Sequence, residues 1–505
     1  MNKIGFQNFR RFANFPEMEY GGITLLVGKN NSGKSTMVKA LLLINDFLKS
    51  KDVSSFSFGN SVLEDANIVT FDRAKCKFSK GNFIKFSYET SDFHAEICIS
   101  GLDGKTTAEV QTYILKDINK GFEIKLEPQN NHITFSTKKG KEKKVPFEND
   151  INIIIIQSQI DDLKNRLVMS DLSETSSEYI EDNTTIKNLE KKIKEIKKIR
   201  KKESSSLHLY SFSMDCDTKR SFFEIFNDFF ESSILRYEDR YHAIQKGKKS
   251  DKEFENLRGF KEDFFVINKR FLDFINSIDK QSQNYLGANP AKQSALFAIR
   301  DKNNALAQAI NEFKQLGIEK ETGNDAYRFV DNWMKSFEIG EGLNIELHAG
   351  EAYEVRILSE KSWIPLADKG MGSIQAMLLI IRLACIIFKS KKYEKQHTVI
   401  IEEPELNLHP ALQSKLADLF HEVYIKYGIQ LIIETHSEYL IRKTQLIVKE
   451  NEYEVKPNEN PFTVVYFDSN EDKQWKMEYR EDGKFANEFG TGFYDESAML
   501  TLNLL

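Results

Sequence analysis

The feature that most constrains this chain is a short turn rich in glycine and lysine, flanked by two apolar segments. Residues 23–27 (ITLLV) are apolar and partly β-branched, which predicts a buried strand. Residues 28–36 follow as GKNNSGKST, and residues 37–48 then place apolar side chains at helical spacing. A strand, a GxxxxGKS turn and a helix in this order form a P-loop, whose backbone amides face a phosphate at the helix N-terminus. The chain therefore carries a nucleotide-binding site.

The residues of this turn have distinct expected roles. Gly28 and Gly33 let the backbone curl so that its amides face the β-phosphate. Lys34 is expected to bridge the β- and γ-phosphates, and the Ser35 hydroxyl to ligate Mg²⁺. The expected nucleotide contacts are Gly28, Asn30, Asn31, Ser32, Gly33, Lys34, Ser35 and Thr36, together with Arg10 and Arg11 near the N-terminus.

Two further apolar runs end in polar residues that a P-loop needs as partners. Residues 398–401 (TVII) predict a buried strand that ends in adjacent carboxylates, the Walker B arrangement. Glu402 is expected to hold Mg²⁺ through a bridging water, and Glu403 to polarise the attacking water. Residues 431–433 (LII) lead to His436, which is placed to hydrogen-bond a γ-phosphate oxygen. Lys34, Glu403 and His436 are thus the expected catalytic residues; the alternatives are an acidic solvent loop and a structural histidine.

A second glycine-containing segment precedes a long apolar stretch. Residues 368–375 (DKGMGSIQ) come before an expected apolar helix at 376–388, so amides at its N-terminus would face an anion. ABC-type ATPases carry their signature loop at this position, shortly before the Walker B strand, and use it on nucleotide bound by the other subunit. The expected signature residues, acting in trans, are Gly370, Gly372, Ser373 and Gln375.

Together these motifs resemble ABC-class ATPases of the SMC/RecF/OLD branch, and in particular bacterial AAA family ATPases that end in an element of unknown function. The resemblance covers residues 1–100 and 280–505. One departure lies in the signature, where Ile374 stands at the position of the family's serine. The segments that carry the resemblance are residues 4–12 (IGFQNFRRF), 285–290 (YLGANP), 402–410 (EEPELNLHP) and 492–496 (GFYDE).

The resemblance implies ATP and Mg²⁺ as cofactors, Mg²⁺-dependent ATP hydrolysis, and a homodimer, or a higher oligomer of dimers, closed by nucleotide. It also implies a role in bacterial anti-phage defence systems such as Septu, PARIS or retrons. There the ATPase would sense infection, or serve as scaffold, for a separate effector, an HNH or TOPRIM nuclease or a toxin. The alternatives are a RecF- or SMC-like DNA-repair or DNA-clamping ATPase, and a scaffold that binds ATP only for assembly.

No intrinsic nuclease is expected in this chain. OLD-type nucleases append a TOPRIM domain, which needs on the order of 100 residues. Only residues 437–505 follow His436, and they are expected to form a strand and a hairpin.

These observations predict an α/β fold, with an ABC-type P-loop NTPase core made of a mixed sheet and an antiparallel β-subdomain. A mainly helical insertion with a short coiled coil is expected to split this core. The core is expected to resume near residue 340, with strands at 343–347 and 353–358. The expected domains are an N-terminal ATPase lobe (1–150), the helical insertion (151–340), a C-terminal ATPase lobe (341–460) and a C-terminal strand and hairpin element (461–505).

Charge restricts the possible contact with nucleic acid to local patches. The chain has 76 acidic against 71 basic residues, a formal charge of −5, which excludes a uniformly basic protein that coats DNA. Residues 187–202, however, carry nine Lys or Arg against two Glu, beside apolar residues at coiled-coil spacing. Such a face suits phosphate-backbone contact, and the alternative is a solvated helix face. The possible DNA contacts are Lys194, Lys197, Lys198 and Lys201.

Cysteine usage and hydropathy point to the cytoplasm. The four cysteines are far apart and lack metal-ligand spacing, which fits a reducing compartment. The longest apolar stretch, residues 376–388, is interrupted by Arg382 and is too short to span a bilayer, so no membrane contact is expected.

Overall fold

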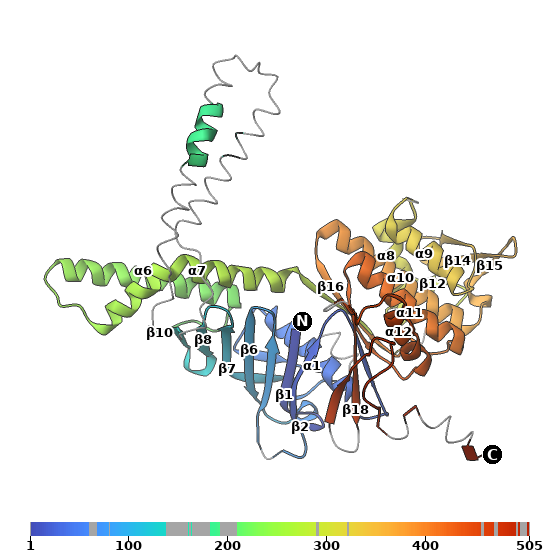
Figure 1. The fold of residues 1–505 in the computed structure, drawn as a ribbon, viewed down its shortest axis with the longest axis horizontal. Helices are drawn as coiled ribbons and strands as arrows, with labels where there is room; N and C mark the ends of the chain where they lie inside the picture. Colours follow the sequence, from blue (N-terminus) through green and yellow to red (C-terminus); the bar gives the residue numbers. More distant parts are fainter. Residues whose placement is uncertain are drawn as a thin grey trace.

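The structure is a computed structural model with two large β-sheets and two groups of helices. Figure 1 shows the antiparallel strands with α6 and α7 on one side of the molecule, and the helices α8 to α12 on the other. The residues it describes are 2–59, 68–79, 81–137, 160, 163, 182–191, 210–288, 292–320, 323–455, 459–468, 473–490, 493–494 and 502–503.

A six-stranded sheet forms the centre of the molecule. Its strands, in spatial order, are β11 (Gln281–Leu286), β16 (Gln396–Glu402), β17 (Gln430–Glu434), β3 (Ile23–Gly28), β18 (Phe462–Asp468) and β19 (Lys473–Met477). The first five are parallel, and β19 is antiparallel to β18. Their continuous apolar runs suit strands that are covered on both faces. The carboxyl ends of neighbouring parallel strands meet at one edge, which is where ligands bind in such sheets.

A nine-stranded antiparallel sheet forms the predicted β-subdomain. Eight strands lie in the order β10-β9-β8-β7-β6-β5-β1-β2, and β4 pairs with β7. Buried and partly exposed residues alternate along β6, as expected for a sheet with one covered face. The strands are β1 (Asn2–Phe9), β2 (Phe12–Tyr20), β4 (Ser55–Ser57), β5 (Ile84–Glu89), β6 (Phe93–Ser100), β7 (Thr107–Asp117), β8 (Phe122–Glu127), β9 (His132–Thr137) and β10 (Ser211–Asp215).

Two hydrophobic cores cover the two faces of the central sheet. Helix α1 (Lys34–Leu48) packs in the core that joins the antiparallel sheet to one face, which includes Ile400 and Ile432. The opposite face, which includes Val399 and Leu431, packs against the C-terminal helices. The alternation of neighbouring strand residues between the two cores fixes the register of the sheet, because a slip of one residue would exchange the faces. The predicted α/β fold class is confirmed.

Apart from α1 and α3, the helices named among the described residues fall into two groups. Helices α6 (Phe222–Gln245) and α7 (Lys252–Lys280) pack on the antiparallel sheet through aromatic contacts, such as Phe93 with Phe274 at 5.0 Å between ring centroids. The short α3 (Phe71–Ala74) lies near the N-terminal turn. The second group consists of α8 (Ala305–Leu316), α9 (Asp325–Ser336), α10 (Met371–Tyr393), α11 (Pro410–Tyr427) and α12 (Glu438–Glu450).

The central sheet resumes earlier in the chain than predicted. The strands expected at 343–347 and 353–358 exist as β13 (Gly342–His348) and β14 (Ala352–Ser359), but they belong to a separate four-stranded sheet. That sheet is completed by the short strands β12 (Phe297–Ala298) and β15 (Ser362–Pro365). The central sheet instead includes β11, which lies within the expected insertion. The prediction failed because a sequence pattern indicates that a segment is a strand and does not indicate which strand it pairs with. The domain boundaries themselves stay a prediction.

Helix α10 is longer than the expected 376–388. It spans 23 residues and is long and apolar enough, by length and composition alone, to cross a membrane. Most of it is nevertheless buried inside the protein, in the core formed by the second group of helices. Arg382, which interrupts the apolar stretch, bonds to Glu312 of α8 at 3.0 Å. This pairing explains how a charged residue is accommodated in a core helix.

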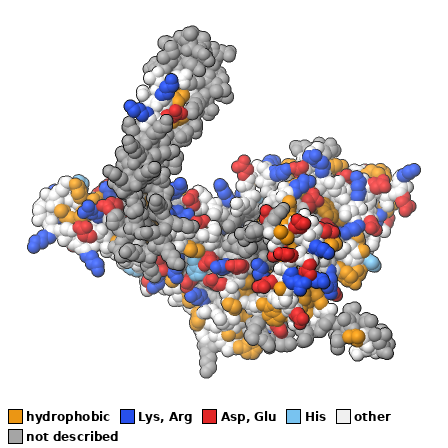
Figure 2. All heavy atoms as spheres, viewed as in Figure 1, with side chains coloured by type: hydrophobic (Ala, Val, Ile, Leu, Met, Phe, Trp, Pro, Cys, Tyr) orange, Lys and Arg blue, Asp and Glu red, His pale blue; other side chains and the backbone are white. Residues whose placement is uncertain are grey.

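Charged side chains of both signs are mixed on the surface. On the face drawn in Figure 2, Lys and Arg alternate with Asp and Glu over the second group of helices. The described residues of this face form no broad patch of one sign, in agreement with the small formal charge of −5. The predicted DNA contacts Lys194, Lys197, Lys198 and Lys201 lie outside the described residues, as does the rest of the expected coiled coil beyond residue 191.

Candidate nucleotide-binding and catalytic site

The turn between β3 and α1 requires glycine at two positions. Gly28 has φ 144°, and a Cβ there would lie 2.3 Å from the carbonyl oxygen of Phe467. Gly33 has φ 108° and precedes α1, and a Cβ there would lie 2.4 Å from the ring of Phe12. Both positions combine positive φ with close packing, which only glycine tolerates. The strand, turn and helix predicted as a P-loop are therefore present.

Lys34 is buried and curls back over the P-loop. Its Nζ donates to the carbonyl oxygens of Gly28 at 3.1 Å and Lys29 at 3.0 Å. Burial lowers the pKa of Lys34, while nearby carboxylates, chiefly Glu434, oppose that shift. The side chain is thus held in place before any phosphate arrives, which reduces the ordering that binding requires.

Glu434, at the carboxyl end of β17, is a site residue that sequence reasoning missed. Its Oε1 accepts a hydrogen bond from the Ser35 hydroxyl at 2.9 Å and lies 3.8 Å from Lys34 Nζ. Burial raises the pKa of Glu434 to about 7; Lys34 opposes this shift and Glu402 adds to it. The carboxylate therefore touches both P-loop side chains that are expected to bind phosphate and Mg²⁺. The available sequence signal was an acidic residue directly before the segment that carries His436.

The predicted carboxylates Glu402 and Glu403 lie at the end of β16, beside Glu434. Glu402 is the register partner of Glu434, and burial raises its pKa. Tyr285, at the end of β11, donates a hydrogen bond to Glu402 and opposes that shift. Glu403 adopts φ 47°, and its N–H donates to the carbonyl oxygen of Glu434 at 2.8 Å. A non-glycine residue in this strained conformation at a strand end is typical of functional sites.

His436 follows β17 and is held by the segment after β16. Its backbone N–H donates to Oε1 of the buried Glu405 at 2.5 Å. Burial, with a smaller effect of Lys34, lowers the pKa of His436 to about 4, so its imidazole is neutral at neutral pH. A neutral ring can donate one hydrogen bond and accept another. Lys34 follows β3, Glu403 follows β16 and His436 follows β17. Because these parallel strands are neighbours, the three residues lie at the same edge of the sheet.

A basic cavity of about 810 Å³ lies over the P-loop, and we call it the P-loop cavity. Among the predicted residues, Arg10 and Arg11 of the β1–β2 turn line it. The predicted nucleotide, metal and catalytic residues that do not line it are Gly28, Asn30, Glu402, Glu403 and His436. One lining segment was not predicted from the sequence: residues 73–78 (RAKCKF), whose basic residues alternate with small or apolar ones. The complete lining is Arg10, Arg11, Asn31, Ser32, Gly33, Lys34, Ser35, Thr36, Lys39, Asp72, Arg73, Lys75, Lys77, Phe78 and Glu434.

The predicted signature residues lie elsewhere. Helix α10 begins at Met371, so Gly372, Ser373 and Gln375 belong to the helix. The sequence had suggested instead that these residues form a loop before the helix. A Cβ on Gly372 would lie 2.7 Å from the carbonyl oxygen of Asn407, so glycine lets this helix end pack on the segment after β16. These residues do not line the P-loop cavity.

The residues at the P-loop fit a magnesium nucleotide. Ser32 Oγ, Glu402 Oε1 and Glu434 Oε2 are buried polar atoms without a hydrogen-bond partner among the described residues. Such atoms cost free energy unless a ligand satisfies them. Hydroxyl and carboxylate oxygens are the ligands that Mg²⁺ prefers, and the basic lining of the P-loop cavity suits phosphates.

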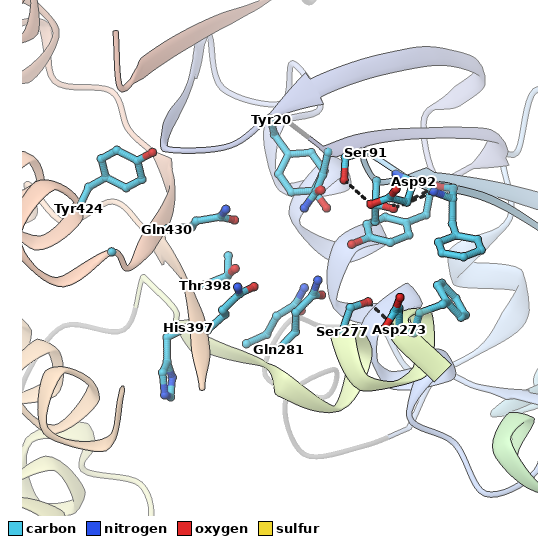
Figure 3. Close-up of a pocket in the computed structure, with 18 of the residues that line it drawn as sticks. Tyr20, Ser91, Asp92, Asp273, Ser277, Gln281, His397, Thr398, Tyr424 and Gln430 are labelled. Atoms are coloured by element: carbon cyan, nitrogen blue, oxygen red, sulfur yellow. Dashed lines mark hydrogen bonds between the residues drawn. The ribbon is translucent and has the colours of Figure 1, made fainter. Parts of the chain in front are cut away.

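A second cavity, of about 580 Å³, lies at the opposite ends of the same strands (Figure 3). Gln281, Gln396 and Gln430, the first residues of β11, β16 and β17, are among its lining. His397 is also part of this lining, but its Nδ1 is engaged by Asn284 at 3.1 Å. Because ligands of parallel sheets bind at the carboxyl ends of the strands, the P-loop cavity is the candidate nucleotide site.

A comparison with protein families agrees with this site. The model of the AAA ATPase domain family matches residues 1–441 of the 505-residue chain. The chain belongs to the AAA ATPase domain family. The membership predicted from the P-loop, Walker B and His436 motifs is thereby confirmed, whereas the predicted role in anti-phage defence is not tested by this match.

Three proteins to which this AAA ATPase is similar match it over part of its length or at low identity. It is 29% identical over 164 residues to the OLD nuclease of Thermus scotoductus (strain ATCC 700910 / SA-01), a match that covers 31% of this chain and 29% of the nuclease. Among solved structures it is similar to the Smc head domain with an extended coiled coil bound to the C-terminal domain of ScpA from Pyrococcus furiosus, at 12% identity and a TM-score of 0.36, covering 100% and 99% of the two chains. It is also similar to the SmcHead bound to the C-winged helix domain of ScpA, at 9% identity and a TM-score of 0.34, covering 94% and 96%.

Proposed function

We propose that this AAA ATPase binds ATP with Mg²⁺ in the P-loop cavity and hydrolyses it at the adjoining edge of the central sheet, where Glu403 and His436 lie. The observation that carries the proposal is the meeting of Lys34, Ser35 and Glu434 with the carboxylates of β16 at one sheet edge. The P-loop amides and Lys34 would hold the phosphates, and Ser35, Glu434 and Glu402 would hold Mg²⁺. Bound Mg²⁺ supplies neutralisation of the charge that develops on the phosphate oxygens. Glu403 would take the proton of the attacking water, and His436 would donate a hydrogen bond from its neutral ring.

The proposed active unit is a head-to-tail homodimer. The signature residues Gly370, Gly372, Ser373 and Gln375 lie outside the P-loop cavity of their own chain, which supports action on the nucleotide of a partner. The N-terminus of α10, a helix of 23 residues, would present amides and a favourable dipole to that phosphate. Nucleotide would then bridge two chains, and hydrolysis would release them.

Mixing two inactive variants tests this arrangement. Lys34→Ala removes phosphate binding, and Ser373→Glu places a negative charge where the partner's phosphate would bind, at a helix start that tolerates acidic residues. Each variant alone is expected to lose turnover. In a mixed dimer one site combines an intact P-loop with an intact signature, so mixing should restore part of the ATPase rate. Absence of recovery, with both variants folded and able to exchange subunits, would contradict a shared site and leave ATP binding by single chains as the alternative.

We further propose that the ATPase cycle controls a separate effector, a nuclease or toxin, in bacterial anti-phage defence. This role rests on the motif resemblance described above, including the sequence EEPELNLHP at 402–410. Purification of the chain from its native operon, with mass spectrometry of the proteins that accompany it, tests the role. A stoichiometric nuclease or toxin is the expected result, and its release or activation should depend on an intact Glu403.

A DNA-clamping ATPase is the second candidate, favoured by the excess of basic residues at 187–202. Changing Lys194, Lys197, Lys198 and Lys201 to Gln should weaken binding to duplex DNA regardless of its sequence. The slope of log affinity against log salt should become shallower by about 0.9 for each lysine that contacts a phosphate. Fluorescence anisotropy at several salt concentrations measures both effects.

A matched control removes the same charge elsewhere. Lys246, Lys248, Lys249 and Lys252 are exposed near the turn between α6 and α7, and their change to Gln should have the smaller effect. If the wild-type chain shows no DNA binding even at low salt, the basic residues at 187–202 do not contact DNA and this second function is wrong.

A further inference from the structure

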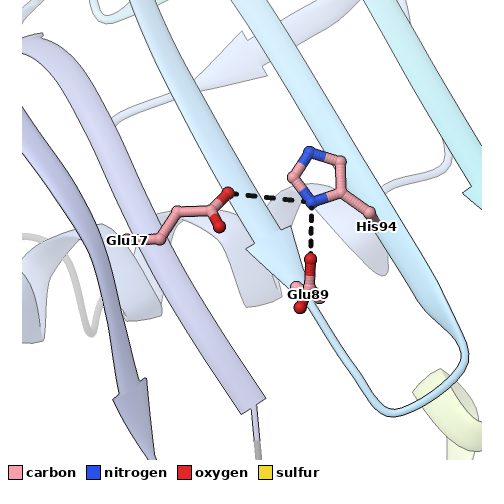
Figure 4. Close-up of side chains that lie close together, drawn as sticks. All are labelled: Glu17, Glu89 and His94. Atoms are coloured by element: carbon pink, nitrogen blue, oxygen red, sulfur yellow. Dashed lines mark hydrogen bonds and ion pairs between the residues drawn. The ribbon is translucent and has the colours of Figure 1, made fainter. Parts of the chain in front are cut away.

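One histidine and two glutamates meet on the outer face of the antiparallel sheet, among residues that do not line the P-loop cavity (Figure 4). His94 belongs to β6, Glu89 ends β5, and Glu17 belongs to β2. The Nδ1 atom of His94 lies 3.2 Å from Glu89 Oε2 and 3.7 Å from Glu17 Oε1. All three atoms lie within 4.8 Å of one another. Three strands thus contribute one ligand-type atom each to a single point.

A glycine on β1, one of the two strands between Glu17 and His94, makes this meeting possible. The strand order β6-β5-β1-β2 places β1 and β5 between Glu17 and His94. A Cβ on Gly5 of β1 would lie 3.0 Å from Glu17 Cγ and 2.7 Å from Ser87 Oγ. Because Gly5 has no side chain, Glu17 can lie across β1 and direct its carboxylate toward His94.

A carboxylate behind His94 orients the ring. Nε2 of His94 lies 3.3 Å from Glu96 Oε1, and Glu96 is bonded to Lys85 at 2.6 Å and Lys116 at 2.9 Å. These two ion pairs hold the Glu96 carboxylate in place as an acceptor beside Nε2. With its proton on Nε2, the ring directs the Nδ1 lone pair at Glu89 and Glu17. A histidine that binds a metal through one ring nitrogen usually donates the N–H of its other ring nitrogen to a carboxylate or carbonyl.

We propose that His94, Glu89 and Glu17 bind a divalent transition metal, with Zn²⁺ as the best match. The separations of 3.2 and 3.7 Å are close to the distance of about 3.3 Å between ligand atoms around a tetrahedral ion with bonds of about 2 Å. Lys3 bonds to Glu89 Oε1 at 2.8 Å, which leaves Oε2 for the metal. An imidazole ligand favours Zn²⁺ over Mg²⁺ or Ca²⁺. The ion would tie β2 to the β5–β6 hairpin, a role separate from the proposed ATPase function.

The chain offers a matched control in a second cluster of the same composition. Glu346, His348 and Glu354 also lie within 4.8 Å of one another. There, however, Arg356 bonds to both oxygens of Glu354, at 2.9 and 3.1 Å. A guanidinium in that position competes for the carboxylate that a metal would need. We therefore expect the His94 cluster to bind zinc and the His348 cluster to bind it poorly.

Zinc titration of the full chain against a chromophoric chelator, without nucleotide or Mg²⁺, tests the site. One equivalent should bind to the wild type, to His348→Asn and to Cys98→Ser, which controls for the thiol on the same strand. This equivalent should be absent in His94→Asn and weakened in Glu17→Gln. Glu96→Gln, which removes the orienting carboxylate and leaves the three ligands unchanged, should weaken it by about 10- to 100-fold. The zinc-dependent rise in melting temperature should follow the same order, because a ligand stabilises the state that binds it.

Two results would overturn the proposal. Equal zinc binding by the wild type and His94→Asn would place the metal elsewhere. Absence of a tightly bound equivalent in the wild type would leave His94 as a side chain that only hydrogen-bonds the surrounding carboxylates. If His94→Asn does not fold, Glu17→Gln decides the question, because Glu17 lies on the exposed side of the sheet and its change leaves the core intact.

Discussion

Glu403→Gln is expected to lower the rate of ATP hydrolysis by about 10²- to 10⁴-fold, the usual contribution of a positioned general base. Gln has nearly the shape of Glu but accepts no proton at neutral pH. The backbone of Glu403 is fixed by its N–H bond to the carbonyl oxygen of Glu434 at 2.8 Å, so the amide should occupy the same place. ATP should still bind, because Lys34 and Ser35 are unchanged. Nucleotide-bound dimer should therefore accumulate, which size-exclusion chromatography with ATP measures.

The same change one residue earlier provides the control. Glu402 faces Glu434 in the strand register and is assigned to Mg²⁺, so Glu402→Gln should raise the Mg²⁺ concentration needed for half-maximal turnover. Glu403→Gln should leave that concentration unchanged and lower the maximal rate. Wild-type turnover in Glu403→Gln would contradict the assignment of the general base, and equal Mg²⁺ dependence of both variants would contradict the division of roles.

The sequence was most informative where function depends on consecutive residues. The strand, turn and helix at 23–48 could be predicted because Gly28, Gly33 and Lys34 must stand at fixed spacing for the loop to curl. Glu402 and Glu403 followed from the same reasoning, because a P-loop NTPase needs carboxylates for Mg²⁺ and the attacking water, and these two directly follow an apolar run. These local patterns carry their own structural context, so no knowledge of the tertiary fold was needed.

Contacts between distant segments could not be predicted in this way. Glu434 is a functional candidate only because β17 lies between β16 and β3, which places its carboxylate beside Ser35. The lining segment 73–78 joins the P-loop cavity because Arg10 donates its backbone N–H to Ala74 near that cavity. Strand pairing is likewise non-local, and β13 and β14 were therefore placed in the wrong sheet. Periodicity determines which face of a strand is buried and leaves its neighbours open.

Glu434→Gln is expected to remove a pH dependence of stability from the nucleotide-free chain. The pKa of Glu434 is about 7 in the folded chain against an ordinary value of 4.5. A carboxyl group whose pKa is raised by folding contributes fully to stability below its unfolded pKa, and this contribution is lost as the pH rises through about 7. Between these limits the free energy of unfolding should fall by about 3 kcal/mol in the wild type on account of this group.

Gln resembles the protonated acid at every pH, so the variant should lack this fall. The difference in free energy of unfolding, variant minus wild type, should be near zero at about pH 4 and about 3 kcal/mol in favour of the variant at about pH 8. Urea unfolding at both pH values measures it, and subtraction cancels the other titrating groups. Glu481→Gln, the same change in an exposed turn, is the matched control. A flat difference for Glu434→Gln would mean that its carboxylate is solvated and ionised throughout. With Mg²⁺ and ATP present the order should reverse, because only the ionised carboxylate can serve as a metal ligand.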